Sequence, residues 1–206
     1  MKKVIILYAL LLVTVTGCIK ENLDDCETIL YFDYLGDGTR DIFLQKIEKV
    51  DMYIYNEDHV CIQKTALDKS ELHRQQGTTL NLPSGQYKVV CWGNSFGDTR
   101  INDDAPLNDN LVGAPHYFTK ELITTNDSFY FGEKEITITN EDYKVDTVPF
   151  SSAHIKMLVE LEGLDANDAR AVTSPVSMEM GNLSPTVNFT KSFSTEQISY
   201  FPLVNF

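Results

Sequence analysis

The chain has 206 residues and a formal net charge of −13, with 17 Lys and Arg residues against 30 Asp and Glu residues. This length suits one large domain or two small ones, and a hydrophobic content of 43% separates the chain from disordered proteins. The acidic balance argues against a nucleic-acid partner, because phosphate binding needs a basic face. Eleven Phe, ten Tyr and one Trp residue favour strands over helices.

The first 17 residues have the pattern of a signal peptide. Lys2 and Lys3 precede an apolar run over residues 4–15, which is too short to span a membrane. The run ends in Val-Thr-Gly-Cys, and small residues before a cysteine resemble the bacterial lipobox. We therefore expect cleavage before Cys18 and attachment of lipid to its thiol. The alternative is an ordinary secretory signal followed by a chance cysteine.

The mature chain divides into three predicted regions. Residues 18–27 are short and polar, and we expect them to form a lipidated tether between the membrane and the fold. Residues 28–192 are predicted to form one β-sandwich domain. We interpret residues 193–206 as the start of a truncated second region, because residues 200–206 look like strand sequence and no polar tail follows.

Short strands separated by turn residues are predicted along the whole domain. In the first half they span residues 28–34, 47–55, 59–64, 78–82 and 86–92. In the second half, residues 128–131 and 136–139 are predicted to form a hairpin, and strands follow at 143–150, 153–161, 176–180 and 186–189. Residues 67–76 allow a short helix, and residues 93–115 are predicted to form a long loop. This series without strand–helix alternation indicates an all-β, antiparallel sandwich.

The predicted strand over residues 86–92 carries apolar side chains on both faces. Its two faces are Tyr87, Val89 and Cys91 on one side, and Lys88, Val90 and Trp92 on the other. Such a pattern is typical of a strand that is covered on both sides. Trp92 is therefore expected in the core, although an exposed Trp beside tyrosines could instead stack on a sugar ring.

No residue pattern indicates catalysis or a cofactor. The sequence has no Gly-x-Ser-x-Gly, Ser-x-x-Lys or P-loop motif. The four histidines, His59, His73, His116 and His154, do not lie at the spacing of metal ligands. Calcium binding by Asp98, Asn102, Asp103 and Asp104 stays open as an alternative to an ordinary solvated loop. We expect neither an enzyme nor a metal protein.

Two stretches together resemble one protein family. The first is Cys-Ile-Lys-Glu-Asn-Leu-Asp-Asp-Cys over residues 18–26, directly after the lipobox. The second is Leu-Asn-Leu-Pro-Ser-Gly-Gln-Tyr-Lys-Val-Val-Cys-Trp-Gly-Asn over residues 80–94. Both resemble the anchor and assembly lipoproteins of the type V fimbriae of Bacteroidales. The resemblance implies a transthyretin-like β-sandwich, and the family usually has a second sandwich domain, which would be absent or truncated here.

The resemblance also implies roles for three cysteines. Cys18 would carry the lipid, and Ile19 in place of Asp favours sorting to the outer membrane. Cys26 is the second cysteine of the family pattern, and it could form a disulfide with Cys91. Cys61 is the competing partner, and a chain without a bridge is the third alternative.

The function implied by the resemblance is structural. We expect a lipid-anchored protein of the outer membrane, exposed on the cell surface, that anchors or helps to assemble fimbriae. Its partners would be fimbrial stalk or accessory subunits, contacted by strand addition, together with the membrane itself. The alternative function is a glycan-binding surface lipoprotein of an uptake system.

Overall fold

The computed structural model describes residues 26–139, 144–160 and 177–202. The strands of the first half are β1 (Cys26–Asp33), β2 (Val50–Tyr55), β3 (Cys61–Leu67), β4 (Gly77–Leu82), β5 (Gly85–Gly93), β6 (Arg100–Asn102) and β7 (Leu111–Gly113). The later strands are β8 (Tyr130–Ile138), β9 (Lys144–Ser152), β10 (Met180–Leu183), β11 (Thr186–Asn188) and β12 (Ile198–Tyr200). The helices are α2 (Phe43–Lys46), α3 (Lys69–Arg74) and α4 (Pro115–Thr119).

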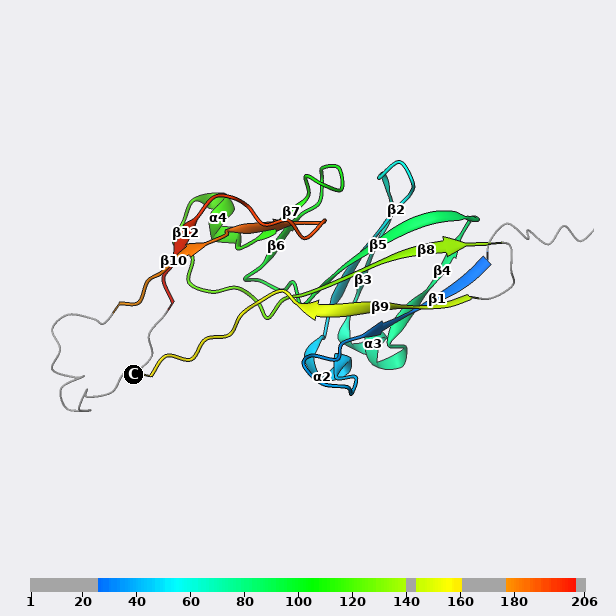
Figure 1. The fold of residues 1–206 in the computed structure, drawn as a ribbon, viewed down its shortest axis with the longest axis horizontal. Helices are drawn as coiled ribbons and strands as arrows, with labels where there is room; N and C mark the ends of the chain where they lie inside the picture. The colour runs from blue at the N-terminus through cyan, green and yellow to red at the C-terminus, as the bar shows by residue number, and fades with distance from the viewer. Residues whose placement is uncertain (1–25, 140–143, 161–176, 203–206) are drawn as a thin grey trace, which may run out of the picture.

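The main sheet has seven strands in the order β3-β2-β5-β8-β9-β1-β4. All neighbours are antiparallel except β1 and β9, which run parallel. Strands β8 and β9 pair over only three residues of each strand, Tyr130–Gly132 and Phe150–Ser152, and the sheet curls at this join (Figure 1). The predicted all-β sandwich is confirmed.

The larger core lies on the inner face of this curled sheet. Leu30 and Phe32 of β1 are buried there, and the ring of Phe32 packs against those of Phe43 and Phe150. The other strand residues of this core are Val50, Met52, Ile54, Leu67, Leu80, Leu82, Val89, Cys91, Tyr130, Ile136, Ile138, Val148 and Phe150. Phe43 of α2 and Leu72 of α3 extend the core beyond the strands.

A second core covers the opposite face of β2, β5 and β8. It contains Trp92 and Val90 of β5 together with Phe131 of β8. Its cover is the small sheet β11-β7-β6, which supplies Val112 of β7, and the adjacent Phe189 just after β11. The prediction that residues 86–92 are buried on both faces is therefore confirmed.

The loop predicted over residues 93–115 was only partly correct, because it contains β6 and β7. Each has only three residues, too few to show an alternating pattern. The predicted hairpin at residues 128–139 was wrong, since β8 runs without a break through Gly132. A Cβ atom at Gly132 would lie 3.0 Å from the ring of Phe150, so this glycine permits close packing within a strand and does not mark a turn.

The predicted strand at residues 153–161 has no strand partner over residues 153–160, and residue 161 lies outside the described part. The first of the two late strands is displaced to Met180–Leu183, and the second is found at Thr186–Asn188. The helix allowed within residues 67–76 is observed as α3. Asp68 and Glu71 form a capping box at its start, in which each side chain accepts the backbone N–H of the other residue.

Candidate functional site

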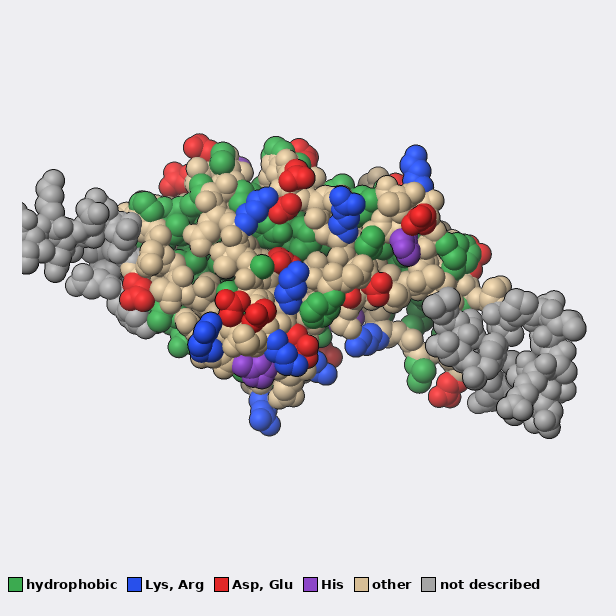
Figure 2. Space-filling model, turned by 180° about the vertical axis from the view of Figure 1, so that it is seen from behind, with side chains coloured by type: hydrophobic (Ala, Val, Ile, Leu, Met, Phe, Trp, Pro, Cys, Tyr) green, Lys and Arg blue, Asp and Glu red, His purple; other side chains and the backbone are tan. Residues whose placement is uncertain are grey.

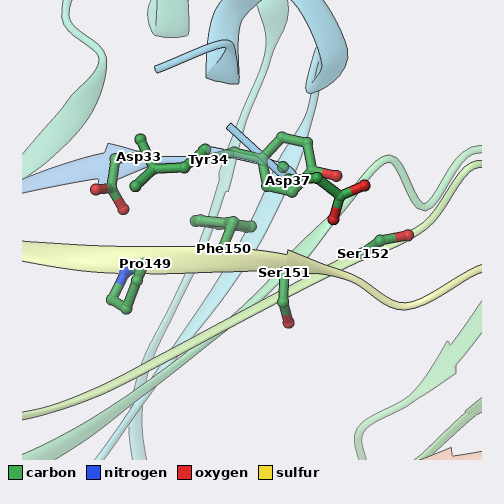
Figure 3. Close-up of a pocket in the computed structure, with 9 residues that line it drawn as sticks. Asp33, Tyr34, Asp37, Pro149, Phe150, Ser151 and Ser152 are labelled. Atoms are coloured by element: carbon green, nitrogen blue, oxygen red, sulfur yellow. The ribbon is translucent and has the colours of Figure 1, made fainter. Parts of the chain in front are cut away.

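A shallow pocket of about 300 Å³ lies where the parallel strands β1 and β9 end. Residues 33–37 form one side and residues 149–152 the other. Figure 3 shows Phe150 directed towards the side of Tyr34 and Asp37, whereas Ser151 points away from it. Tyr34 is held by an edge contact with Tyr130, with ring centroids 5.0 Å apart. Sequence patterns gave no signal for this pocket except the turn that follows residue 34.

Two carboxylates near the pocket have opposite electrostatic environments. Burial, and then the nearby charge of Asp41, raise the pKa of Asp33 above its ordinary value. Burial also acts to raise the pKa of Asp41, but hydrogen bonds outweigh it and lower that pKa. The donors are the side-chain amide of Gln76 and the backbone N–H groups of Phe43 and Tyr34. Asp41 therefore fixes the turn after β1.

The serine hydroxyls of the pocket are already engaged. Ser151 donates to the carbonyl of Phe131 at 3.4 Å, and Ser152 donates to the carbonyl of His154 at 2.9 Å. His154 lies beside the pocket and donates from Nδ1 to the carbonyl of Phe129 at 2.7 Å. Ser152 Oγ also lies 3.3 Å from Nδ1 of His154. Because Nδ1 carries the proton that it donates to Phe129, it cannot act as the base that takes a proton from Ser152.

The possible calcium ligands lie at the two ends of β6, with Asn102 as its last residue, and Asp103 is already paired. Its carboxylate accepts a hydrogen bond from Nζ of Lys64 at 2.9 Å, and its carbonyl accepts another at 3.0 Å. Across the described ranges, no group of three or more acidic, His or Cys side chains is placed to hold a metal ion. Acidic and basic side chains are interspersed over the face shown in Figure 2.

Trp92 is fully buried, as the sequence indicated. Its ring stacks on Phe129 at a centroid distance of 4.8 Å, and Phe131 and Phe189 pack beside it. The indole therefore presents no face to a sugar ring in this structure.

The structure describes neither the predicted lipid site nor the side chain of one predicted disulfide partner. Cys18 lies outside the described residues, as does the side chain of Cys26, whereas Cys61 and Cys91 carry free thiols. Cys26 pairs with Leu82 at the end of β4. Cys91 lies six residues along β5 from Gly85, a rise of about 20 Å.

A disulfide requires Cα atoms within about 7 Å. A bridge between Cys26 and Cys91 would therefore require a rearrangement of β5, and the pairing stays a prediction. Within the part of the chain that the structure describes, no helix is both long enough and apolar enough to cross a membrane.

Solved structures with a similar fold come from Porphyromonas and Bacteroides species. The fimbrial anchor protein Mfa2 from Porphyromonas gingivalis aligns with 85% of this chain at 9% identity and a TM-score of 0.59. A candidate adhesin from Bacteroides ovatus covers 89% of the chain at 17% identity and a TM-score of 0.64. A candidate polysaccharide-binding protein from Bacteroides thetaiotaomicron covers 85% at 14% identity and a TM-score of 0.65.

The chain spans 63–66% of the length of these three solved structures. No curated protein matches the chain. The sequence model of one family, the fimbrillin-A associated anchor proteins Mfa1 and Mfa2, matches residues 23–205. This match covers most of the sequence and agrees with the shared sandwich fold. The chain therefore belongs to the family of fimbrillin-A associated anchor proteins.

Proposed function

We propose that the protein is a non-catalytic lipoprotein that anchors surface fimbriae or assists their assembly. In this proposal the lipid on Cys18 holds the protein at the outer membrane, with its sandwich exposed on the cell surface. Strand-mediated contact joins the protein to fimbrial subunits. The observation that carries the proposal is the family match over residues 23–205, which begins only a few residues after the lipobox.

The two edge strands of the main sheet support contact by strand addition. Strands β3 and β4 stand at the two ends of the seven-strand order, so each has one neighbour in that sheet. The backbone groups on the free side of an edge strand can pair with a strand from another protein. The engaged serines and the shallow pocket support a binding role over a catalytic one.

The membrane part of the proposal is tested by Cys18→Ser in the full-length chain. We expect the wild-type protein in the outer-membrane fraction with lipid-labelled Cys18. The variant should lose the label and leave that fraction. Cys61→Ser is the matched control, because it removes a thiol from the folded domain and should change neither result. Unchanged membrane retention of the Cys18→Ser protein would overturn lipid anchoring.

The fimbrial part is tested by purification from outer membranes of the native organism. We expect fimbrial subunits to co-purify with the wild-type protein after mild detergent extraction. Fimbriae should be shed into the medium when the protein is present only as the Cys18→Ser variant. Purification of the folded, lipidated protein without any fimbrial subunit would contradict the proposal.

A further inference from the structure

The stretch after β9 is the most exposed apolar segment among the described residues. Ile155 is 89% exposed, Leu158 85% and Met157 66%. Residues 153–160 run on from β9 away from the main sheet without forming a strand (Figure 1). In the described part of the chain, no backbone hydrogen bond joins residues 155–160 to another segment. The stretch therefore has the apolar residues typical of a strand, but they are exposed and do not pack in a sheet.

The start of this segment is fixed to the sandwich. The backbone N–H of Ala153 donates to the carbonyl of Phe129 at 2.9 Å. The ring of His154 donates to the same carbonyl and packs edge-on against Tyr130, with ring centroids 5.1 Å apart. Residues 155–160 are therefore presented from a defined point of the fold.

The sequence of the segment is complementary to itself. In a strand, Ile155, Met157 and Val159 lie on one face. Lys156, Leu158 and Glu160 lie on the other. All six are exposed, and no salt bridge among the described residues includes the lysine or the glutamate.

We propose that residues 156–160 of two copies of this chain pair as antiparallel strands about a two-fold axis at Leu158. In this register Lys156 of each copy faces Glu160 of the other, so two ion pairs flank a central pair of leucines. On the opposite face, Met157 of each copy lies against Val159 of the other. A two-fold contact of this kind uses the same patch on both copies and closes on itself.

Other registers match the side chains less well. A parallel, in-register pair would set Lys156 against Lys156 and Glu160 against Glu160, and like charges directly opposite each other destabilise a strand pair. An antiparallel pair centred on Met157 would set Lys156 against Leu158 and leave the ammonium group without an acidic partner. The charges therefore select the antiparallel register centred on Leu158.

This self-association is a separate matter from contact with fimbriae. A ribbon of two short strands is only marginally stable in water, so we expect a reversible dimer that forms as concentration rises. Attachment to a common membrane would raise the effective concentration of the segment. The pairing involves no fimbrial subunit, so a chain that stays monomeric could still anchor fimbriae.

Sedimentation equilibrium of the mature chain tests the pairing. We expect a concentration-dependent dimer for the wild type. Lys156→Glu should weaken it by about tenfold, because it creates two like-charge contacts, and Glu160→Lys should do the same. The double variant Lys156→Glu/Glu160→Lys keeps the net charge and exchanges the pairs, so it should restore the dimer. Arg40→Glu, the same change in charge at another exposed site, should have no effect.

Oxidative crosslinking tests the register itself. The thiols introduced by Leu158→Cys would face each other across the two-fold axis, so they should form an intermolecular disulfide that peptide mapping identifies. Ile155→Cys is the matched control, because position 155 does not face itself in this register and should crosslink far less. A monomer at every concentration, or a double variant that fails to recover the dimer, would overturn the inference. Equal crosslinking at both positions would overturn the register.

Discussion

The indole ring of Trp92 lies parallel to the ring of Phe129, with centroids 4.8 Å apart and an angle of 10° between the planes. Phe189, which comes from near the other end of the chain, closes this aromatic cluster at 5.7 Å from Trp92. It also contacts Tyr53 of β2 at 4.9 Å. Phe189, just after β11, therefore packs the small sheet β11-β7-β6 against the main sheet.

Phe189→Ala should lower the free energy of unfolding by about 3–5 kcal/mol, the usual cost of truncating a fully buried phenylalanine. The fluorescence of Trp92, the only tryptophan, reports the change directly. We expect a red-shifted native spectrum and a denaturation midpoint at lower denaturant. Phe193→Ala is the matched control, because Phe193 is 66% exposed and its loss should leave both measurements nearly unchanged.

The alternation in residues 86–92 was enough to predict a strand buried on both faces. What covers its Trp92 face could be predicted only in part, because β11 was expected at residues 186–189, whereas β6 and β7, with three residues each, were not. Such strands are stabilised by pairing across the fold, between Val112 and Val187 for example. Tertiary contacts of this kind leave no local pattern in a sequence.

The error at Gly132 has a different physical origin. A Gly-Glu-Lys sequence between two aromatic or β-branched runs is a typical turn signal. In the fold, Gly132 sits where β8 and β9 join, and the ring of Phe150 occupies the space that a side chain would take. A glycine required for close approach and a glycine required for a turn look alike in one sequence.

The pocket between β1 and β9 could not be predicted either, because the parallel pairing of these strands joins residues more than 100 positions apart.

Among the Gly→Ala substitutions, Gly77→Ala should lower the free energy of unfolding the most. Gly77 has a φ of +149°, and a Cβ atom there would lie 1.9 Å from the carbonyl oxygen of Leu30. Because the obstacle is backbone, relief requires β1 and β4 to separate. We expect a loss of about 3 kcal/mol or more in the free energy of unfolding, measured by urea denaturation. Gly97→Ala, where no atom lies within 4 Å, should be nearly neutral, and equal losses at both sites would contradict this packing.

Asp33→Asn should stabilise the protein at neutral pH and not at low pH. The folded-state pKa of Asp33 is raised by burial and by Asp41. The protonated carboxyl group of Asp33 therefore contributes to the stability of the fold below the unfolded pKa of about 3.9. This contribution is lost as pH rises through the folded pKa. Removing the charge at pH 7 should raise the free energy of unfolding by less than about 1 kcal/mol, because the carboxyl group is largely solvated.

Asp41→Asn should have the opposite dependence. Although burial acts to raise the pKa of Asp41, its hydrogen bonds lower it. Its contribution is therefore present above the unfolded pKa and is lost as pH falls through the folded pKa. The variant should be less stable than the wild type at pH 7 and close to it at pH 2–3, as measured by thermal unfolding across pH. Parallel behaviour of the two variants would contradict the assignment.

The rate of thiol alkylation should distinguish Cys91 from Cys61 in the folded domain. Cys91 is fully buried, and burial raises the pKa of its thiol, so it should resist alkylation in the native protein. Burial also raises the pKa of the Cys61 thiol, but Cys61 is only half-buried and should react slowly.

After denaturation without reductant, the separation along β5 predicts that Cys91 becomes fully alkylated. If Cys91 instead stays protected until reductant is added, and peptide mapping joins it to Cys26, the bridge implied by family resemblance exists. The register would then differ from the pairing of Cys26 with Leu82 and of Gly85 with Ile138. Mass spectrometry of peptides alkylated under the three conditions distinguishes these outcomes. Cys61→Ser provides the control, because it should remove only the slowly reacting thiol.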